Sequence, residues 1–248
     1  MKKILKRVLL GIGIIIVLLI IIAVGFLLKF RSETKNMNVI PSGKIVDNIY
    51  SVKDSFVNMF LIRDSTQYIA IDAGNSSESI SGELKKLNIS PDQVTTVLLT
   101  HTDGDHVAAL QLFKNAKVYI SRQEEDMITG KKSKFLFFGN HIPTKDYSLI
   151  DDRQFLQLGT LNVQGILTPG HTSGSMCFLV NDKYLFTGDA IRLKDGKIVE
   201  FNKFFNMDSK AAKESIKKIT NLPGVEYIFT AHYGYTGDYS NAVKDWKK

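Results

Sequence analysis

The feature that most constrains the fold of this chain is a short segment with four side chains of metal-ligand type, namely His101, Asp103, Asp105 and His106. The segment follows an apolar, β-branched run at residues 94–99 that is typical of a buried strand, and residues 107–112 after it suit a helix. The four side chains are therefore expected on a strand-to-helix loop, where nitrogen and oxygen donors converge on a small volume. Gly104 is expected to let the backbone turn sharply between them.

Three later segments favour a metal site over a simple polar turn. Taken alone, the first segment could be an Asp/Gly turn that leads into a helix capped by Asp. However, three more apolar runs each end in a residue of ligand type, and these residues are His171, Asp189 and His232. Each falls just past an expected strand, which is where sheet proteins gather their sites. The seven side chains together are enough to hold two metal ions.

The order and spacing of these residues resemble the metallo-β-lactamase superfamily. Its signature is His-x-His-x-Asp-His, followed by a later His, a bridging Asp and a final His. The resemblance covers residue 44 to the C-terminus and includes Ile-Asp-Ala-Gly at 71–74, a segment of the type seen in that family. It implies an α/β fold, the αββα four-layer sandwich. One position departs from the pattern, because Asp103 stands where the family usually has its second His.

The resemblance also implies a role for each candidate residue in a metal-dependent hydrolase. It assigns His101, Asp103 and His171 to one divalent ion, Asp105, His106 and His232 to a second ion, and Asp189 to a bridge between them. Zinc is the first expectation, with manganese or iron as alternatives. A metal-bound hydroxide would attack the substrate, and Asp105 would orient it and receive its proton. Tyr233 and Tyr235 could donate to a developing oxyanion, or could equally well be packing residues.

The Asp103 substitution changes the charge of the expected centre. A carboxylate in place of an imidazole adds one negative charge, so the site should be a weaker Lewis acid, and hard oxygen ligands shift its preference toward manganese or iron. The best-known antibiotic-hydrolysing members of the family have Cys where this chain has Asp189. The segment around His171 is more similar to that of the thioesterase and lactonase members, so β-lactamase activity is not expected.

Three classes of function follow from these residues. The first is a hydrolase that cleaves an ester, thioester, lactone or phosphodiester in a small-molecule substrate. The second is a metal-binding sensing or binding module in which Asp103 marks weakened or lost hydrolysis, and the third is a di-iron redox protein. The hydrolase is favoured because every other ligand position is filled. Because fold does not fix chemistry, the substrate and the oligomeric state stay open.

The N-terminal part of the chain predicts a membrane anchor. An uninterrupted apolar run at residues 8–28 lies between a basic tail at 1–7 and a polar linker at 29–40, and about 20 apolar residues span a bilayer as a helix. The alternative is a cleaved signal peptide, although such cores usually have about 7–15 residues. The basic tail places the N-terminus in the cytoplasm, which leaves the domain at 41–248 outside a cell membrane that the chain crosses once.

The net charge of the chain indicates no partner other than the lipid bilayer around the N-terminal helix. The chain of 248 residues carries a formal charge of +7, but seven Lys/Arg and one Glu through Lys35 account for +6 of it. The domain is therefore nearly neutral, and a nucleic-acid partner is not expected. The lone Cys177 cannot form an internal disulfide and is expected to be a buried apolar residue.

Aromatic segments at 134–138 and 201–205 could be core or could wall a substrate cleft, whereas His141 is expected in a surface loop. Periodicity and turn signals also predict the regular elements of the domain. Strands are expected at 44–50, 57–63, 68–72, 94–99, 118–121, 155–158, 161–167, 176–180, 184–187 and 225–230. Helices are expected at 81–87, 107–112, 122–128 and 208–222. Strands interleaved with helices suit two sheets packed face to face with helices outside.

Overall fold

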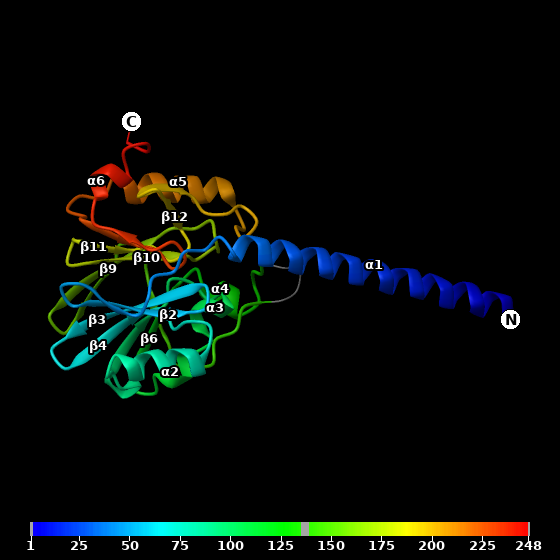
Figure 1. The fold of residues 1–248 in the computed structure, drawn as a ribbon, viewed down its shortest axis with the longest axis horizontal. Coiled ribbons are helices and arrows are strands. Elements are labelled where there is room, and N and C mark those ends of the chain that lie inside the picture. The colour runs from blue at the N-terminus through cyan, green and yellow to red at the C-terminus, as the bar shows by residue number, and fades with distance from the viewer. Residues whose placement is uncertain (1, 135–138, 248) are drawn as a thin grey trace. The chain divides into compact units, whose positions relative to one another are not determined.

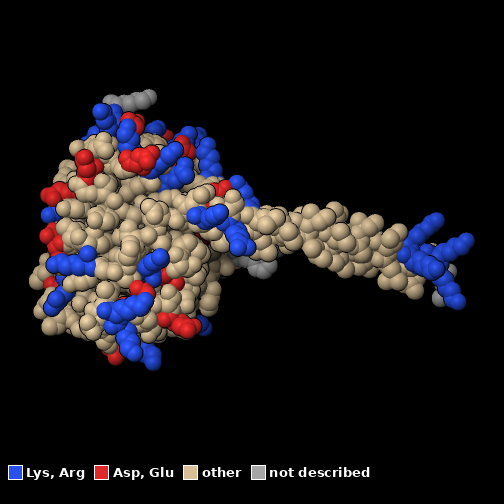
Figure 2. Space-filling view, in the orientation of Figure 1, with Lys and Arg blue, Asp and Glu red and all other residues tan. Residues whose placement is uncertain are grey.

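The computed structural model describes residues 2–134 and 139–247, and the chain divides into two units, Met1–Met37 and Asn38–Lys248. The first unit contains α1 (Lys2–Thr34), which has no buried residues. By length and composition α1 is able to cross a membrane, although a signal sequence would pass the same test. Figure 2 shows the basic side chains gathered at the N-terminal end of α1 and an uncharged stretch after them.

The second unit is built on two sheets. The first sheet has the order β1-β2-β3-β4-β5-β6-β7, and its strands are β1 (Gly43–Val46), β2 (Ile49–Asp54), β3 (Val57–Asp64), β4 (Gln67–Ile71), β5 (Val94–Leu98), β6 (Lys117–Ser121) and β7 (Ser148–Ile150). Pairing is antiparallel from β1 to β4 and parallel from β4 to β7. The single strand expected at 44–50 is wrong, because Asp47 adopts a positive φ of 45° and the chain turns there between β1 and β2.

The second sheet has the order β15-β14-β11-β10-β9-β8. Its strands are β8 (Phe155–Leu158), β9 (Leu161–Leu167), β10 (Met176–Val180), β11 (Tyr184–Phe186), β14 (Tyr227–Phe229) and β15 (Tyr235–Thr236). A separate hairpin consists of β12 (Ile191–Lys194) and β13 (Lys197–Glu200). Sequence patterns missed β7, β12, β13 and β15, because these strands have two to four residues and show no clear alternation of apolar and polar side chains.

The helices of this unit are α2 (Ser77–Lys86), α3 (Gly104–Val107), α4 (Glu125–Ile128), α5 (Ser209–Thr220) and α6 (Tyr239–Ala242), with 3₁₀ turns at Pro91–Gln93 and Leu110–Leu112. The prediction for α5 is confirmed, and the Asp208 side chain caps it by accepting from two backbone N–H groups. The helix expected at 107–112 is wrong. The chain leaves helical geometry after α3, and Leu110 packs into the core from the 3₁₀ turn that follows.

Three apolar clusters separate four layers. Alternate residues of β3 face opposite sides, so Leu61 joins a cluster beneath α2 while Phe60 joins a cluster between the two sheets. In the same way β10 directs Phe178 between the sheets and Cys177 into a third cluster, to which α5 contributes. Fully burying a side chain such as Phe178 contributes about 1.5–3 kcal/mol. The αββα arrangement is therefore confirmed, and Figure 1 shows α2 and α5 on opposite outer faces.

Strand direction brings particular loops to one edge of the sandwich. Strands β9 and β11 both run antiparallel to β10, and β14 runs parallel to β11, so β9, β11 and β14 end at the same edge of the second sheet. The parallel strands β4, β5 and β6 likewise end together in the first sheet. Loops after the carboxyl ends of parallel strands are the usual place for a site.

Candidate metal centre

The first four predicted donors lie on the chain that leaves β5. His101 follows this strand, Asp103 precedes α3, and Asp105 and His106 lie within α3. The ring of His106 is completely buried, whereas 21% of the Asp105 side chain is exposed. Gly104 starts α3, and a Cβ added to it would meet nothing within 4 Å. Gly104 also has no positive φ, so the expectation that its conformational freedom lets the backbone turn sharply there is wrong.

The other three donors follow strands of the second sheet. His171 comes after β9, Asp189 after β11 and His232 after β14. The turn before Asp189 does require glycine, because Gly188 has a φ of +50° and an added Cβ would lie 2.4 Å from the Thr100 Oγ1 atom. This close approach brings the end of β11 against the loop after β5. The two sheets thereby deliver their donors to one place.

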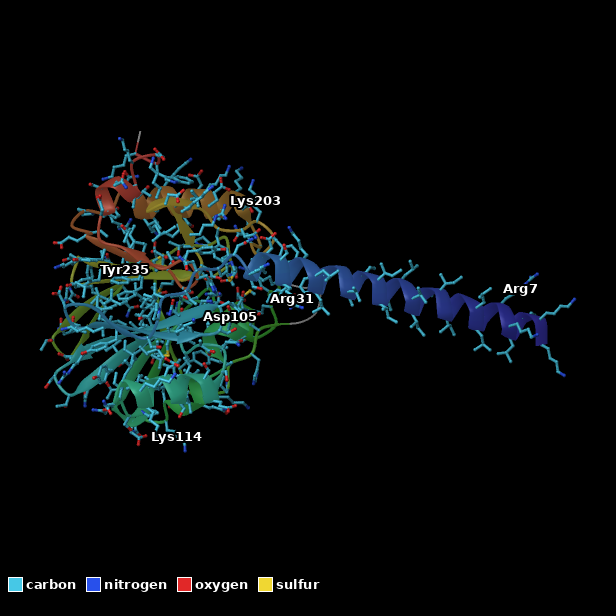
Figure 3. All side chains as sticks on the ribbon, in the orientation of Figure 1. Arg7, Arg31, Asp105, Lys114, Lys203 and Tyr235 are labelled. Atoms are coloured by element: carbon cyan, nitrogen blue, oxygen red, sulfur yellow. The ribbon has the colours of Figure 1, made fainter. Side chains whose placement is uncertain are left out.

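The structure brings all seven predicted donors together. Those whose donor atoms lie within 4.8 Å of one another form three groups: His101, Asp103 and His171; His101, His106 and Asp189; Asp105, His106 and His232. The carboxylate of Asp189 lies between His171 on one side and His106 and His232 on the other. Its Oδ1 atom is 3.1 Å from Nε2 of His232 and 3.6 Å from Nε2 of His106, and its Oδ2 atom is 3.3 Å from Nε2 of His171. Figure 3 shows Asp105 in this region, between the two sheets.

Hydrogen bonds at Nδ1 orient three of the four His donors so that their Nε2 atoms face the centre. The Nδ1 atom of His106 lies 2.8 Å from the Asp72 carboxylate, and that of His232 lies 2.6 Å from the Phe56 carbonyl oxygen. These oxygens only accept, so each ring carries a proton on Nδ1, and in the neutral ring the Nε2 lone pair points to the centre. The Nδ1 atom of His101 is similarly 3.1 Å from Thr100 Oγ1.

The donor atoms fit a divalent metal ion. Among the described residues, Nε2 of His101, Nε2 of His106 and Oδ1 of Asp189 are buried and make no hydrogen bond. Leaving such atoms buried without a partner costs about 1–3 kcal/mol each, so a ligand that satisfies several of them at once is favoured. Imidazole nitrogen and carboxylate oxygen are the donors that zinc, manganese and iron accept.

The electrostatics of the centre also favour a cation. Burial lowers the pKa of His106, but the carboxylates of Asp105, Asp72 and Asp189 outweigh burial and raise that pKa to about 10. Burial would raise the pKa of Asp189, yet the surrounding His rings hold it well below its usual range. Negative charge therefore dominates around His106, as expected where a cation binds.

Sequence reasoning missed four residues that support the donors. Asp72, quoted only within the 71–74 segment, also accepts from the Thr100 N–H at 2.7 Å. Glu124 is buried and accepts from hydroxyl groups on the loops that carry His101 and His171, as described below. Lys134 and Asn140 both reach the carboxylate of Asp103. The extra negative charge of Asp103 is the signal that could have prompted a search for a partner such as Lys134.

The predicted tyrosines lie at different distances from the donors. Tyr233 is half-buried, and its ring centre is 6.5 Å from that of His232 and 6.0 Å from that of Phe201. The structure does not bring Tyr235 to the donors: its side chain is 43% exposed and its ring stacks on Phe229. In Figure 3 Tyr235 lies well apart from Asp105.

The remaining sequence expectations also have places in the fold. Phe201 is buried, and its ring centre lies 5.1 Å from that of His171 with the two rings nearly perpendicular, so this end of the 201–205 segment lines the centre. Of the 134–138 segment, residues 135–138 lie outside the described residues. His141 is exposed, as expected. Cys177 is buried, which raises its pKa to about 12 and fits its expected role as an apolar residue.

Comparison with known proteins identifies the family. Residues 52–232 match the metallo-beta-lactamase superfamily, and this stretch contains every predicted donor. The chain belongs to this superfamily. A subclass B3 metallo-beta-lactamase described as having an active-site glutamic acid has a similar structure, with a TM-score of 0.65 at 18% identity over 88% of this chain and 90% of that one. At that identity the likeness shows the fold alone.

Curated relatives in the superfamily are similar over part of their length. A probable metallo-hydrolase of Methanocaldococcus jannaschii is 32% identical over 151 residues, which are 61% of this chain and 63% of that protein. A probable polyketide biosynthesis zinc-dependent hydrolase of Bacillus velezensis, BaeB, is 30% identical over 132 residues, which are 52% of each protein. This chain thus spans between half and two thirds of the length of these relatives.

Proposed function

We propose that this superfamily member is a metal-dependent hydrolase. The observation that carries the proposal is the meeting of buried, inward-facing His Nε2 atoms with the carboxylates of Asp105 and Asp189 at one edge of the sandwich. Zinc is the first candidate ion, because it accepts these donors and because BaeB, which is similar in sequence, is named as a zinc-dependent hydrolase. Manganese and iron are the alternatives, since Asp103 adds a hard oxygen donor.

We assign the predicted donors to two positions. His101, Asp103 and His171 face the first position, Asp105, His106 and His232 face the second, and Asp189 faces both. When bound, divalent ions supply Lewis acidity and a water that ionises near neutral pH. Asp105 is partly exposed, so its carboxylate is able to orient a water and receive its proton. The hydroxyl of Tyr233, beside His232, is the candidate donor to a developing oxyanion.

The expected substrates are small molecules with an ester, thioester, lactone or phosphodiester bond. The similarity of the segment around His171 to thioesterase and lactonase members, and the presence of Asp189 where antibiotic-hydrolysing members have Cys, support this choice. The apolar helix α1 supports a location at the cell membrane, with residues 8–28 as a single-pass anchor and the domain at 41–248 outside the cytoplasm.

The test of this function uses the full chain in detergent, loaded with zinc and assayed against a panel containing all four bond types. We expect turnover of at least one class and its loss on chelation. The variant His106→Ala should lose more than roughly 100-fold in activity, because loss of partners outside the ligand shell alone costs about 10–100-fold. Replacing the exposed His141 with Ala is the matched control and should change nothing. Turnover that survives both chelation and His106→Ala would rule out the proposal.

A second candidate is a metal-binding module without hydrolysis, and one observation favours it. The ammonium group of Lys134 contacts two of the donors, Asp103 and His171, and so competes with an ion for them. The same panel separates the candidates. A protein that binds zinc tightly but turns over no substrate is a binding module, whereas zinc-dependent turnover identifies the enzyme.

A further inference from the structure

Lys134 lies inside the first donor group. Only 8% of its side chain is exposed, and its ammonium group contacts the Asp103 carboxylate and lies 2.9 Å from Nε2 of His171. Lys131 of the same segment differs, because its side chain is 70% exposed and its ammonium group lies 3.6 Å from the partly exposed carboxylate of Asp126. A buried ammonium is stable only when it is paired, so the position of Lys134 depends on the groups it contacts.

Both oxygens of the Asp103 carboxylate accept hydrogen bonds from neighbouring side chains. One oxygen receives the Lys134 ammonium and lies 3.0 Å from Nε2 of His171, and the other accepts from the Asn140 amide at 2.9 Å. The Lys134 ammonium and the Asn140 amide thus donate to its two oxygens, which satisfies the carboxylate without an ion. The ammonium also lies at hydrogen-bond distance from the Nε2 atom that His171 would offer to an ion at the first position.

We propose that the Lys134 ammonium takes the place of the first metal ion, so that this chain binds one divalent ion at the second position. This inference rests on the proposed function and narrows its prediction of two ions to one. The single ion is held by Asp105, His106, Asp189 and His232. Asp103, which replaces a family His, is then the counter-ion of Lys134 and not a metal ligand.

Charge at the centre agrees with one ion. The three donor carboxylates, those of Asp103, Asp105 and Asp189, carry three negative charges, which one dication and one ammonium balance, while the Asp72 carboxylate lies against the His106 ring. A second dication would lie against the ammonium of Lys134, and like charges in a buried site repel strongly.

Counting bound zinc tests the inference without relying on activity. The full chain in detergent is dialysed against excess zinc, and zinc per chain is measured by elemental analysis for the native chain and for Lys134→Ala and Lys134→Gln. We expect one zinc in the native chain and two in both variants, since removing the ammonium frees Asp103 and His171. Lys131→Ala is the matched control and should bind one zinc. Circular dichroism establishes that each variant is folded.

A second variant tests the role of Asp103 directly. In Asp103→Asn the carboxylate beside the Lys134 ammonium becomes a neutral amide, but the proposed single ion keeps all four of its ligands, so zinc affinity should fall by less than about 10-fold. A fall of roughly 10-fold or more in affinity, of the size seen when a partner of a metal site is lost, would show that Asp103 is a ligand and overturn the inference.

The outcomes separate failure of this inference from failure of the proposed function. Two zinc ions in the native chain, or one zinc in both folded Lys134 variants, would overturn the inference and leave a metal-dependent hydrolase. A native chain that binds no zinc under these conditions would refute the proposed function, and the inference would fail with it.

Discussion

His106 depends on a carboxylate that lies 34 positions before it in the chain. Asp72 has a positive φ of 62°, an uncommon conformation for a residue with a side chain, and its carboxylate accepts from the His106 ring and from Thr100. Strained backbone of this kind persists where the surroundings fix it, and it is frequent at functional sites. Asp72 therefore sets which nitrogen of His106 is free to bind an ion.

The substitution Asp72→Asn tests this dependence. An amide nitrogen beside Nδ1 of His106 would donate to it, which moves the ring proton to Nε2 and removes the lone pair from the centre. We expect zinc affinity to fall by about 10–100-fold in competitive titration. Asp64→Asn, a change at the half-buried end of β3, is the control. Equal affinities of the Asp72 and Asp64 variants would contradict the assigned role.

A second residue-scale prediction concerns the turn before Asp189. In Gly188→Ala the new Cβ would lie 2.4 Å from Thr100 Oγ1 at a positive φ, so the free energy of unfolding should fall by about 1–3 kcal/mol or more. Urea denaturation measures it. Gly104→Ala is the matched control, because a Cβ there meets nothing within 4 Å, and its effect should stay within about 1 kcal/mol. Similar losses in both variants would argue against the close approach.

At this scale the clustering of the candidate donors was predictable, whereas the residues that hydrogen-bond to them were not. His101, Asp189 and His232 follow strands in a recognisable order, so their positions are visible in the sequence. Asp72 and Lys134 act across 34 and 37 residues, on His106 and His171 respectively, and no local pattern marks such a pairing.

Among the elements, the loops that follow the strands share one anchor. Glu124, after β6, accepts from the N–H and hydroxyl of Thr102 at 2.8 and 2.7 Å and from the hydroxyl of Thr172 at 2.6 Å. Thr102 belongs to the loop after β5, and Thr172 to the loop after β9 in the other sheet. One buried carboxylate thus ties His101 and His171 to each other.

Replacing this anchor should weaken the fold. In Glu124→Gln an amide NH₂ group replaces one of the two oxygens that accept from Thr102 and Thr172, and we expect a loss of about 1–3 kcal/mol in unfolding free energy. Thermal and urea unfolding measure it. Glu125→Gln, at the neighbouring and less buried position, should cost within about 0.5 kcal/mol. An equal cost at both positions would mean that Glu124 is not an anchor.

The same variant predicts a pH dependence. Burial raises the pKa of Glu124 above its unfolded value, so the folded state binds this proton more readily. The contribution of Glu124 to stability is then complete below the unfolded pKa and decreases as the pH rises through the folded pKa. Because Gln does not titrate, Glu124→Gln should cost more at about pH 4 than at about pH 7. The reverse order would show that the carboxyl is stabilised in its charged form.

Elements with strong periodicity were predictable, and short ones were not. The pattern of β3 and β10, with apolar residues on both faces, marks strands that two layers bury. By contrast β15 has two residues and α3 has four, and such elements form because the rest of the fold holds them. Their own sequences carry no sufficient signal.

For the molecule as a whole, a bound ion should raise stability. An ion that binds only the folded state adds about 2.7 kcal/mol at a free concentration of 100 times its dissociation constant. We expect zinc to raise the melting temperature of the native chain and EDTA to reverse the change. His232→Ala removes one donor and should abolish most of the response. A melting temperature that is the same with and without zinc would contradict the proposed centre.

The N-terminal unit makes a separate prediction about location. If residues 8–28 are an anchor, the chain recovered from membranes should keep this run, which intact-mass measurement reveals. Leu18→Arg near the middle of the run should reduce membrane insertion, because Arg there costs about 2.5–3.5 kcal/mol. Ser32→Arg, outside the run, is the control. The alternative signal peptide would be cleaved after Ala23-Val24-Gly25, a small-x-small segment, so a released chain that begins after residue 25 would show a cleaved signal peptide instead.

The meeting of donors from both sheets has a mechanical consequence. An ion held by His106 of one sheet and by His232 of the other joins the halves of the sandwich much as a disulfide would, in a chain with a single buried cysteine. Such an ion leaves only when the halves part or a ligand loop opens. The rate at which isotopically labelled zinc exchanges would therefore measure how often the domain opens.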